Sequence, residues 1–123
     1  MKHIKTFEGL FDFLKKKEKQ LYCQYKEGDY VVGVNSRYIN ELKDYVENNA
    51  GLIYHIADGP KYNHVPYIYV KYNKILSGES VTPGRLSKHE GDRLMFFEQE
   101  LKYATPDQIE QYQLEEYSNK YNI

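Results

Sequence analysis

The segment that most restricts how this chain folds is residues 65–72, where the side chains fall into two alternating sets. One set is Val65, Tyr67, Tyr69 and Lys71, and the other is Ile68, Val70 and Tyr72. A period of two residues is that of a β-strand, because its successive side chains point to opposite faces. The pattern therefore predicts a strand with one buried face and one tyrosine-rich face.

Further strands are predicted on both sides of this one. They lie at residues 30–34, 52–56 and 94–97, and the last continues or bends through Leu101 and Tyr103. Turn signals precede the first of them and end the second. A parallel pair would need a long crossover between the strands. We therefore expect an antiparallel, strongly curved sheet of four or five strands.

Apolar residues at helical spacing predict two helices in the first half of the chain. The first covers residues 6–21, with Thr6 as its N-cap. The second covers residues 37–48, where Ser36 would cap the start and Gly51 would give the left-handed exit.

The C-terminal helix has the best-defined start. Thr105 is an N-cap residue, Pro106 suits the first helical position, and Gln108 completes a capping box. The helix is expected to run to about residue 117. Its expected inward-facing residues are Ile109, Tyr112 and Tyr117.

These elements fit one domain of the α+β class. The chain has 123 residues, of which 41% are apolar and 28% charged, as in a globular domain. The expected organisation of residues 1–123 is an N-terminal helix at 1–25, a sheet at 28–104 with an inserted helix at 37–48, and a C-terminal helix at 105–118. The polar stretch at residues 73–92 is too long for a simple hairpin loop, which suggests function or mobility.

Charge is balanced over the whole chain but not along it. The net charge of -1 excludes a global field that would draw the protein to nucleic acid or to a membrane. Residues 61–93 hold six cations and three acids, whereas residues 98–123 hold two cations and six acids. The two segments could attract each other within the molecule or between copies.

Cysteine usage and hydropathy indicate the compartment. Cys23 is the only cysteine, so no intramolecular disulfide can form, and a reducing cytosol fits. The apolar runs are only a few residues long, far below the roughly 20 that cross a bilayer. We expect a cytoplasmic protein that does not contact a membrane.

Residues that carry catalysis or bind metals are present but not grouped. The histidines lie on different predicted elements and are His3, His55, His64 and His89. Neither a Cys-x-x-Cys nor a His-x-x-x-His spacing occurs, and the glycines lie at separate turns and strands rather than in a phosphate loop. We expect no metal, no cofactor and no enzymatic activity.

One group of residues has the composition of a binding surface. Its members are aromatic or cationic: Lys61, Tyr62, Tyr67, Tyr69, Lys71, Lys74, Arg85 and Arg93. Aromatic rings on a curved sheet can stack on unpaired bases while cations hold phosphates. Tyrosine and arginine are equally favoured anchors of protein interfaces. Another interpretation is that Tyr67 and Tyr69 simply pack under the terminal helix.

Three segments resemble the strands of SH3-like small barrels. They are Gly-Asp-Tyr-Val-Val at residues 28–32, Gly-Leu-Ile-Tyr-His-Ile at 51–56 and Tyr-Ile-Tyr-Val-Lys-Tyr at 67–72. The helix at 37–48 and the segment at 73–92 depart from a minimal barrel. The chain ends resemble those of small proteins encoded by bacteriophages, at residues 1–8, 103–110 and 120–123.

The phage resemblance implies an accessory role. The leading hypothesis is a binding protein that inhibits a bacterial host or defence protein, such as a CRISPR nuclease, by stoichiometric occlusion in the host cytoplasm, as anti-CRISPR proteins do. The first alternative is an RNA or single-stranded DNA binding module that uses the same residues. The second is a structural or virion component that associates through its opposite charges.

Overall fold

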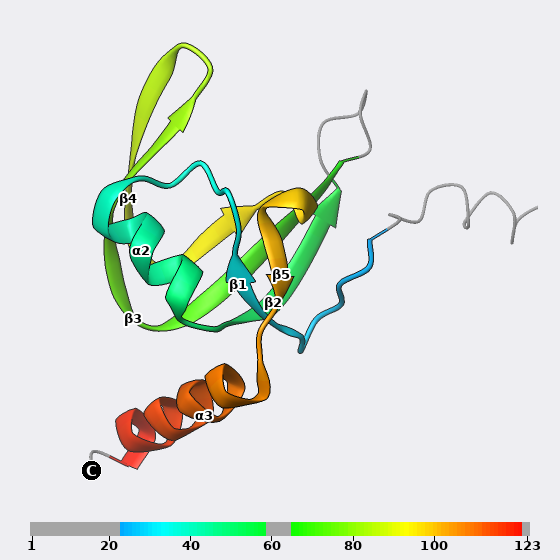
Figure 1. Ribbon diagram of the computed structural model, residues 1–123, viewed down its shortest axis with the longest axis vertical. Coiled ribbons are helices and arrows are strands. Elements are labelled where there is room, and N and C mark those ends of the chain that lie inside the picture. The colour runs from blue at the N-terminus through cyan, green and yellow to red at the C-terminus, as the bar shows by residue number, and fades with distance from the viewer. Residues whose placement is uncertain (1–22, 59–64, 122–123) are drawn as a thin grey trace, which may run out of the picture.

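The computed structural model describes residues 23–58 and 65–121. Five antiparallel strands form one sheet in the order β4-β3-β2-β1-β5 (Figure 1). The strands are β1 (Tyr30–Gly33), β2 (Gly51–Asp58), β3 (Pro66–Thr82), β4 (Arg85–Phe96) and β5 (Leu101–Tyr103). The described helices are α2 (Asn40–Asn48), the single 3-10 turn η1 (Glu98–Glu100) and α3 (Pro106–Tyr121). The predicted α+β class and antiparallel sheet are confirmed.

The predicted N-terminal helix at residues 6–21 lies outside the described residues. The end of the wider range 1–25 is not helical, because residues 23–25 are irregular. The predicted turn follows, where the Lys26 N–H donates to the Asp29 carboxylate at 2.9 Å. Tyr25 is buried, and its hydroxyl donates to the Leu101 carbonyl at 2.9 Å, which ties this segment to the sheet.

β1 confirms the predicted strand and is paired on both sides. Val31 lies opposite Gly51 of β2 and opposite Tyr103 of β5. Val31 and Val32 point to opposite faces of the sheet, yet both are completely buried. β1 is therefore covered on both faces, which explains why its sequence has consecutive valines instead of an alternation.

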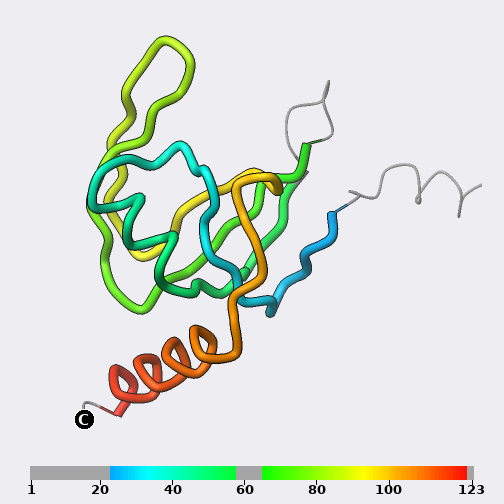
Figure 2. Tube along the Cα trace, viewed as in Figure 1, coloured from blue at the N-terminus to red at the C-terminus, as the bar shows by residue number. Residues whose placement is uncertain are grey.

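Residues 73–92 are not a long connection between strands, because they form the two arms of a hairpin. Their suggested function or mobility stays a prediction. β3 and β4 pair from Ile68 opposite Phe96 to Thr82 opposite Arg85. The turn has Gly84 at φ 84°, a left-handed conformation that favours glycine. The tip of the hairpin projects beyond the rest of the sheet (Figure 2). A projecting ribbon has little core to bury, so its strands lack the apolar alternation that would reveal them.

α2 confirms the predicted inserted helix but begins later, and neither predicted cap is used. Residues 37–39 pair with β3 instead, where the Ile39 N–H donates to the Glu79 carbonyl at 3.0 Å. Ser36 does not cap the helix, whose N-cap position is Ile39. At the other end the chain leaves in an extended conformation at Asn49, and Gly51 already belongs to β2. Glycine is needed there because a Cβ would lie 2.3 Å from a methyl group of Val70.

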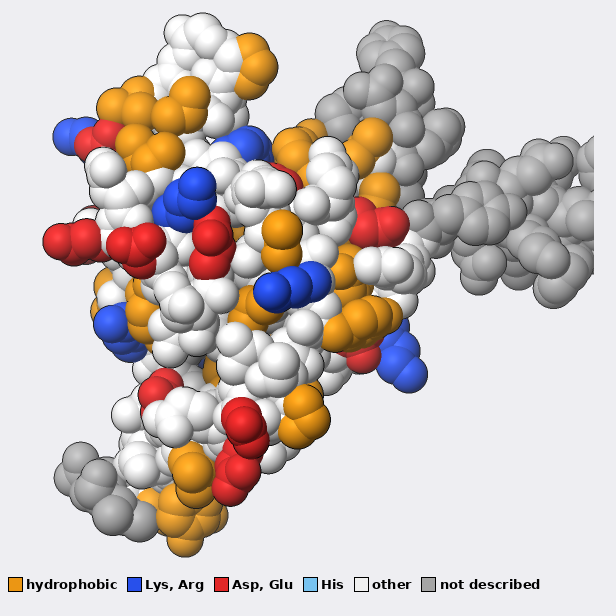
Figure 3. Space-filling view, in the orientation of Figure 1, with side chains coloured by type: hydrophobic (Ala, Val, Ile, Leu, Met, Phe, Trp, Pro, Cys, Tyr) orange, Lys and Arg blue, Asp and Glu red, His pale blue; other side chains and the backbone are white. Residues whose placement is uncertain are grey.

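α3 begins as predicted and ends later. The Gln108 N–H donates to Thr105 Oγ1 at 3.2 Å, and the Thr105 N–H donates to Gln108 Oε1 at 2.9 Å, so the capping box is confirmed. Tyr112 is buried, but Tyr117 is 57% exposed, so its predicted inward orientation is wrong. Hydrophobic side chains gather at the C-terminal end of α3, at the bottom of the space-filling view (Figure 3).

The main core lies between α2 and one face of the sheet. Its members come from α2, all five strands and the irregular segments: Tyr25, Val31, Tyr38, Leu42, Val46, Ile53, Ile68, Val70, Tyr72, Leu76, Leu94, Phe96 and Leu101. A second, smaller cluster joins Val32, Ala50 and Tyr112, and attaches α3. In the described part of the chain, no helix combines the length and the apolar character needed to cross a membrane.

Candidate interaction face

The outward-facing side chains of β3 lie on the side of the sheet opposite the main core. Ile68, Val70 and Tyr72 are at most 1% exposed, whereas the side chains between them are half-buried or exposed. The predicted alternation is therefore confirmed. The outer face of β3 therefore presents Tyr67, Tyr69 and Lys71. The surface that they form continues onto β2 and β4.

Tyr69 is the centre of one half of this surface. The β2 register shifts between Ile53 and His55, which places His55 opposite Tyr69. The His55 and Tyr69 rings stack with centroids 5.7 Å apart, and the Tyr54 ring lies 6.2 Å from Tyr69. The Arg93 guanidinium lies 4.9 Å from the Tyr54 ring centroid, a cation–π distance. The bulge thus brings two consecutive β2 residues to the same tyrosine.

Tyr67 is the centre of the other half. Its ring lies 5.6 Å from that of Phe97, and the Arg37 guanidinium lies 4.6 Å from the Phe97 centroid. Arg37 is held in place by Glu100, with Nε 3.3 Å from Oε2, and by the Met95 carbonyl at 3.1 Å. The Arg37 cation is therefore oriented by contacts within the molecule.

Glu100 is the buried anchor of this half. It is 4% exposed, and its carboxylate accepts from three donors. The Arg37 N–H and the Phe97 N–H each donate at 2.8 Å, in addition to the Arg37 guanidinium. A buried carboxylate is tolerated when it is paired and hydrogen-bonded in this way.

We call this surface the aromatic–cationic face. Its members are Arg37, Tyr54, His55, Tyr67, Tyr69, Lys71, Arg93, Met95 and Phe97. Lys71 and Arg93 lie directly opposite each other on β3 and β4, and Tyr69 lies opposite Met95. The face offers flat rings, a thioether and cations on a rigid sheet, which suits contacts by stacking, cation–π interaction and apolar packing.

The structure brings half of the predicted site residues together. Tyr67, Tyr69, Lys71 and Arg93 lie on the aromatic–cationic face. Lys74 and Arg85 do not, because the β3–β4 hairpin carries them away from this face. Lys74 lies over the Tyr45 ring of α2 at 4.4 Å, and Arg85 lies at the hairpin turn. Lys61 and Tyr62 lie outside the described residues.

The interpretation that Tyr67 and Tyr69 pack under the terminal helix is wrong. α3 contacts β3 further along the strand, where the Tyr112 hydroxyl donates to the Lys71 carbonyl at 3.4 Å. Their rings contact β2 and the residue after β4 instead. Sequence reasoning missed Arg37, Tyr54, His55, Met95 and Phe97. The Tyr54-His55 pair within the predicted strand at 52–56 was the available signal, whereas the position of Arg37 depends on Glu100, which is distant in sequence.

One serine and one histidine lie at the distance of a nucleophile and its base. Ser80 Oγ is 2.7 Å from His89 Nε2. Ser80 is 2% exposed, so its hydroxyl is not accessible to a substrate. Burial, and then the Arg37 charge, lower the pKa of His89. The pair therefore acts as an internal hydrogen bond of the hairpin.

Cys23 does not have the environment of a reactive thiol. Burial is the largest cause that raises its pKa, and the Glu98 carboxylate also raises it. A raised pKa disfavours the thiolate, which is the nucleophilic form. Within residues 23–58 and 65–121, no three metal-ligating side chains are grouped as a metal site would require.

Comparison of the chain with protein-family models, with curated proteins and with solved structures finds no match.

Proposed function

We propose that this protein is a non-enzymatic binding module that inhibits a bacterial host or defence protein, such as a CRISPR nuclease, by covering a site on it in a stoichiometric complex. The aromatic–cationic face is the proposed contact surface. The single observation that carries this proposal is the row of half-buried rings, with the Arg37 and Arg93 guanidinium groups against them, on the sheet face opposite the main core.

The composition of the face favours a protein partner. Tyrosine, phenylalanine, methionine and arginine are the residues enriched at the centres of protein interfaces. Because Arg37 and Tyr69 are already held by neighbours, binding them costs little additional side-chain entropy. Pre-ordered anchors of this kind give affinity to a small interface.

The strand arrangement supports an SH3-like barrel as the finer description of the fold. β1 lies between β2 and β5, β2 to β4 follow in sequence order, and a single 3-10 turn precedes β5. This is the order of SH3-like barrels, with α2 inserted between the first two strands and a lengthened β3–β4 hairpin. In such a barrel the outside of β2, β3 and β4 is free for contacts.

The bacterial partner and the cytoplasmic location rest on the resemblance of the chain ends to phage proteins. A phage accessory protein acts in the cytoplasm of the host, where a protein with a single cysteine stays reduced. Occlusion requires a rigid surface rather than a catalytic group, and the sheet provides one.

The test is capture from bacterial lysate with the purified protein as bait, with and without nuclease treatment. A variant with Tyr67→Ala, Tyr69→Ala, Lys71→Ala and Arg93→Ala is compared with a control that has Val81→Ala and Leu86→Ala. The control removes exposed apolar side chains from the hairpin, 50% and 56% exposed, outside the face. We expect a stoichiometric protein that survives nuclease, is retained by the control and is lost by the face variant. Retention by the face variant contradicts the proposal.

A second candidate function is binding of RNA or single-stranded DNA. The observation that favours it is the opposed pair Lys71 and Arg93 beside the Tyr69 ring, since cations next to an aromatic ring can hold a phosphate and a stacked base. Titration with a single-stranded oligonucleotide at rising salt separates the two functions. Phosphate contacts weaken steeply with salt, whereas an interface with an apolar centre weakens less.

A further inference from the structure

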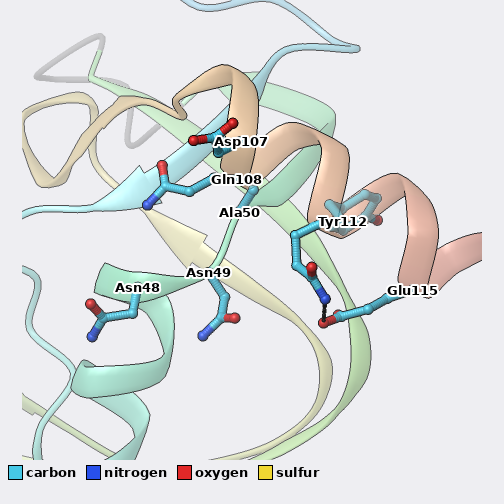
Figure 4. Close-up of a pocket in the computed structure, with 8 residues that line it drawn as sticks. Asn48, Asn49, Ala50, Asp107, Gln108, Tyr112 and Glu115 are labelled. Carbon is cyan, nitrogen blue, oxygen red and sulfur yellow. Dashed lines mark hydrogen bonds between the residues drawn. The ribbon is translucent and has the colours of Figure 1, made fainter.

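An open cleft with mixed polar and apolar lining, which includes Leu114, lies away from the aromatic–cationic face, between α2, β3 and α3. It has a volume of about 530 Å³. Its polar border consists of Tyr45 of α2 and Asn49 directly after α2, Asn73 and Lys74 of β3, and Glu115 and Asn119 of α3. A smaller hollow of about 180 Å³ adjoins it at the C-terminal end of α2 and shares Asn49 and Glu115 (Figure 4). Three separate elements thus contribute polar side chains to one opening.

Each of the two amides on the α2 side uses one N–H of its NH2 group in a bond to a carbonyl of α2. Asn49 Nδ2 donates to the Tyr45 carbonyl at 3.0 Å, and Asn48 Nδ2 donates to the Asp44 carbonyl at 2.7 Å. Both asparagines therefore close the end of α2 with their NH2 groups. Among the described residues no hydrogen bond reaches their Oδ1 atoms, which remain available as acceptors.

The amides on the β3 and α3 side also each use one N–H in an internal bond. Asn73 Nδ2 donates to the Tyr112 carbonyl at 2.8 Å, and Asn119 Nδ2 donates to the Asn73 carbonyl at 2.9 Å. These bonds attach α3 to β3. They also leave the two Oδ1 atoms without a donor from residues 23–58 or 65–121. Residues with amide oxygens that accept no described hydrogen bond therefore border the cleft on both sides.

Glu115 adds a negative charge to these acceptors. Its Oε1 accepts from Gln111 Nε2 at 2.9 Å, which fixes the carboxylate at the border of both hollows (Figure 4). Glu115 also contributes, after burial, to the raised pKa of Tyr45 across the cleft. The carboxylate therefore acts on the α2 side of the opening although it belongs to α3.

The chain already places one alkylammonium group in this cleft. Lys74 Nζ lies 4.4 Å from the Tyr45 ring centroid, a cation–π contact. Lys74 borders the same opening as Asn49, Asn73 and Glu115. The environment that accepts the ammonium of Lys74 has the chemistry to accept an external ammonium in its place.

We propose that the cleft between α2, β3 and α3 binds a primary alkylammonium group, either of a free polyamine or of a lysine side chain on another molecule. An ammonium has three donors and no acceptor, which matches a lining of free amide oxygens and a carboxylate. Lys74 is the internal competitor that occupies the Tyr45 ring when the cleft is empty. This binding site is separate from the aromatic–cationic face and does not depend on the proposed function.

The test is a two-dimensional NMR titration of the purified protein, observing backbone and asparagine side-chain amides. Putrescine and spermidine represent free polyamines, and Nα-acetyl-lysine methylamide represents a lysine side chain. 1,4-Butanediol has the carbon chain of putrescine without its charge and is the ligand control. We expect both kinds of amine to shift Asn49, Asn73 and Asn119, and the tighter ligand identifies the source. Equal shifts with butanediol, or no shifts with any amine, overturn the proposal.

Variants test the roles of the two charged residues. Glu115→Gln is expected to weaken amine binding by about tenfold or more, because a charge-assisted hydrogen bond is lost. Lys74→Gln is expected to tighten it, because the competing ammonium is gone. Glu110→Gln is the matched control, because it removes the same charge at an exposed position elsewhere on α3. It is expected to leave amine binding unchanged. Equal weakening by Glu110→Gln and Glu115→Gln, or weakening by Lys74→Gln, contradicts the proposal.

Discussion

The two faces of β3 have similar residue types and opposite surroundings. Tyr72 on the inner face is 1% exposed and packs in the main core, whereas Tyr69 on the outer face is half-buried by single side chains of β2. The inner face is ordered because a second layer covers it. The outer face is ordered by ring stacking and by Arg37, which Glu100 holds, and no described helix packs over the Tyr67 and Tyr69 rings. A binding surface needs side chains that are ordered and still accessible to another molecule.

The largest expected effect is a difference in the free energy of unfolding between a substitution on the inner side of the sheet and one on the outer face. Phe96→Ala removes a completely buried ring from the core and is expected to lower the free energy of unfolding by about 3–5 kcal/mol. Tyr69→Ala on the outer face is expected to lower it by less than about 1 kcal/mol. Urea unfolding followed by circular dichroism measures both. Similar losses would show that the outer face is part of the core.

The second effect concerns the carboxylate that orients Arg37. Glu100→Ala leaves the Phe97 and Arg37 N–H groups without their acceptor and is expected to cost about 1–3 kcal/mol. Partner capture should decrease as well, since Arg37 loses its support. Thermal unfolding and capture are measured on the same protein. An unchanged stability would contradict the anchoring role of Glu100.

The third effect is a gain in stability on the inner face. The Tyr72 hydroxyl is buried and has no hydrogen-bond partner in the described part of the chain, and burial raises its pKa well above the ordinary value. Tyr72→Phe removes this unsatisfied group and is expected to stabilise the fold by about 1 kcal/mol. Tyr69→Phe is the matched control and should change little. Destabilisation by Tyr72→Phe would indicate that the hydroxyl is satisfied.

The smallest effect is a pH dependence at the hairpin. The pKa of His89 is lowered in the folded protein, so the unfolded chain binds the proton more readily. Stability is therefore expected to fall as pH decreases below about 6.5, the ordinary histidine value. The decrease between pH 7.5 and 5 should be smaller in His89→Gln than in the unchanged protein. Identical pH profiles would exclude His89 as a contributor.

Sequence reasoning located the elements that bury one face. The alternation at Val70 and Tyr69 and the capping box at Thr105 are local patterns, and each gave a correct strand or helix start. The hairpin at residues 73–92 was missed because a projecting ribbon carries polar residues on both faces. The start of α2 was misplaced because residues 37–39 pair with β3, a contact across about 40 positions that no local pattern encodes.

The candidate site, like the fold, was predictable where it depends on local sequence patterns and not where it depends on contacts between distant segments. Tyr67, Tyr69 and Lys71 follow from the alternation of one strand, and Arg93 follows once β4 is paired with it. Arg37 was not predictable, because Glu100, 63 positions further along the chain, holds it in place. Phe97 lies in the predicted strand at 94–97, but its contact with Tyr67 depends on the pairing of β3 with β4. His55 depended on a bulge, which has no distinct sequence signal in β2.

The most direct test of the central claim is hydrogen–deuterium exchange of the protein, free and in complex with the partner obtained by capture. If the outer face of the sheet is the contact surface, protection should increase at residues 54–57, 66–71 and 93–97. The hairpin turn at residues 82–86 and the end of α3 should exchange as in the free protein. Protection confined to the hairpin or to α3, with these three segments unchanged, would contradict the account.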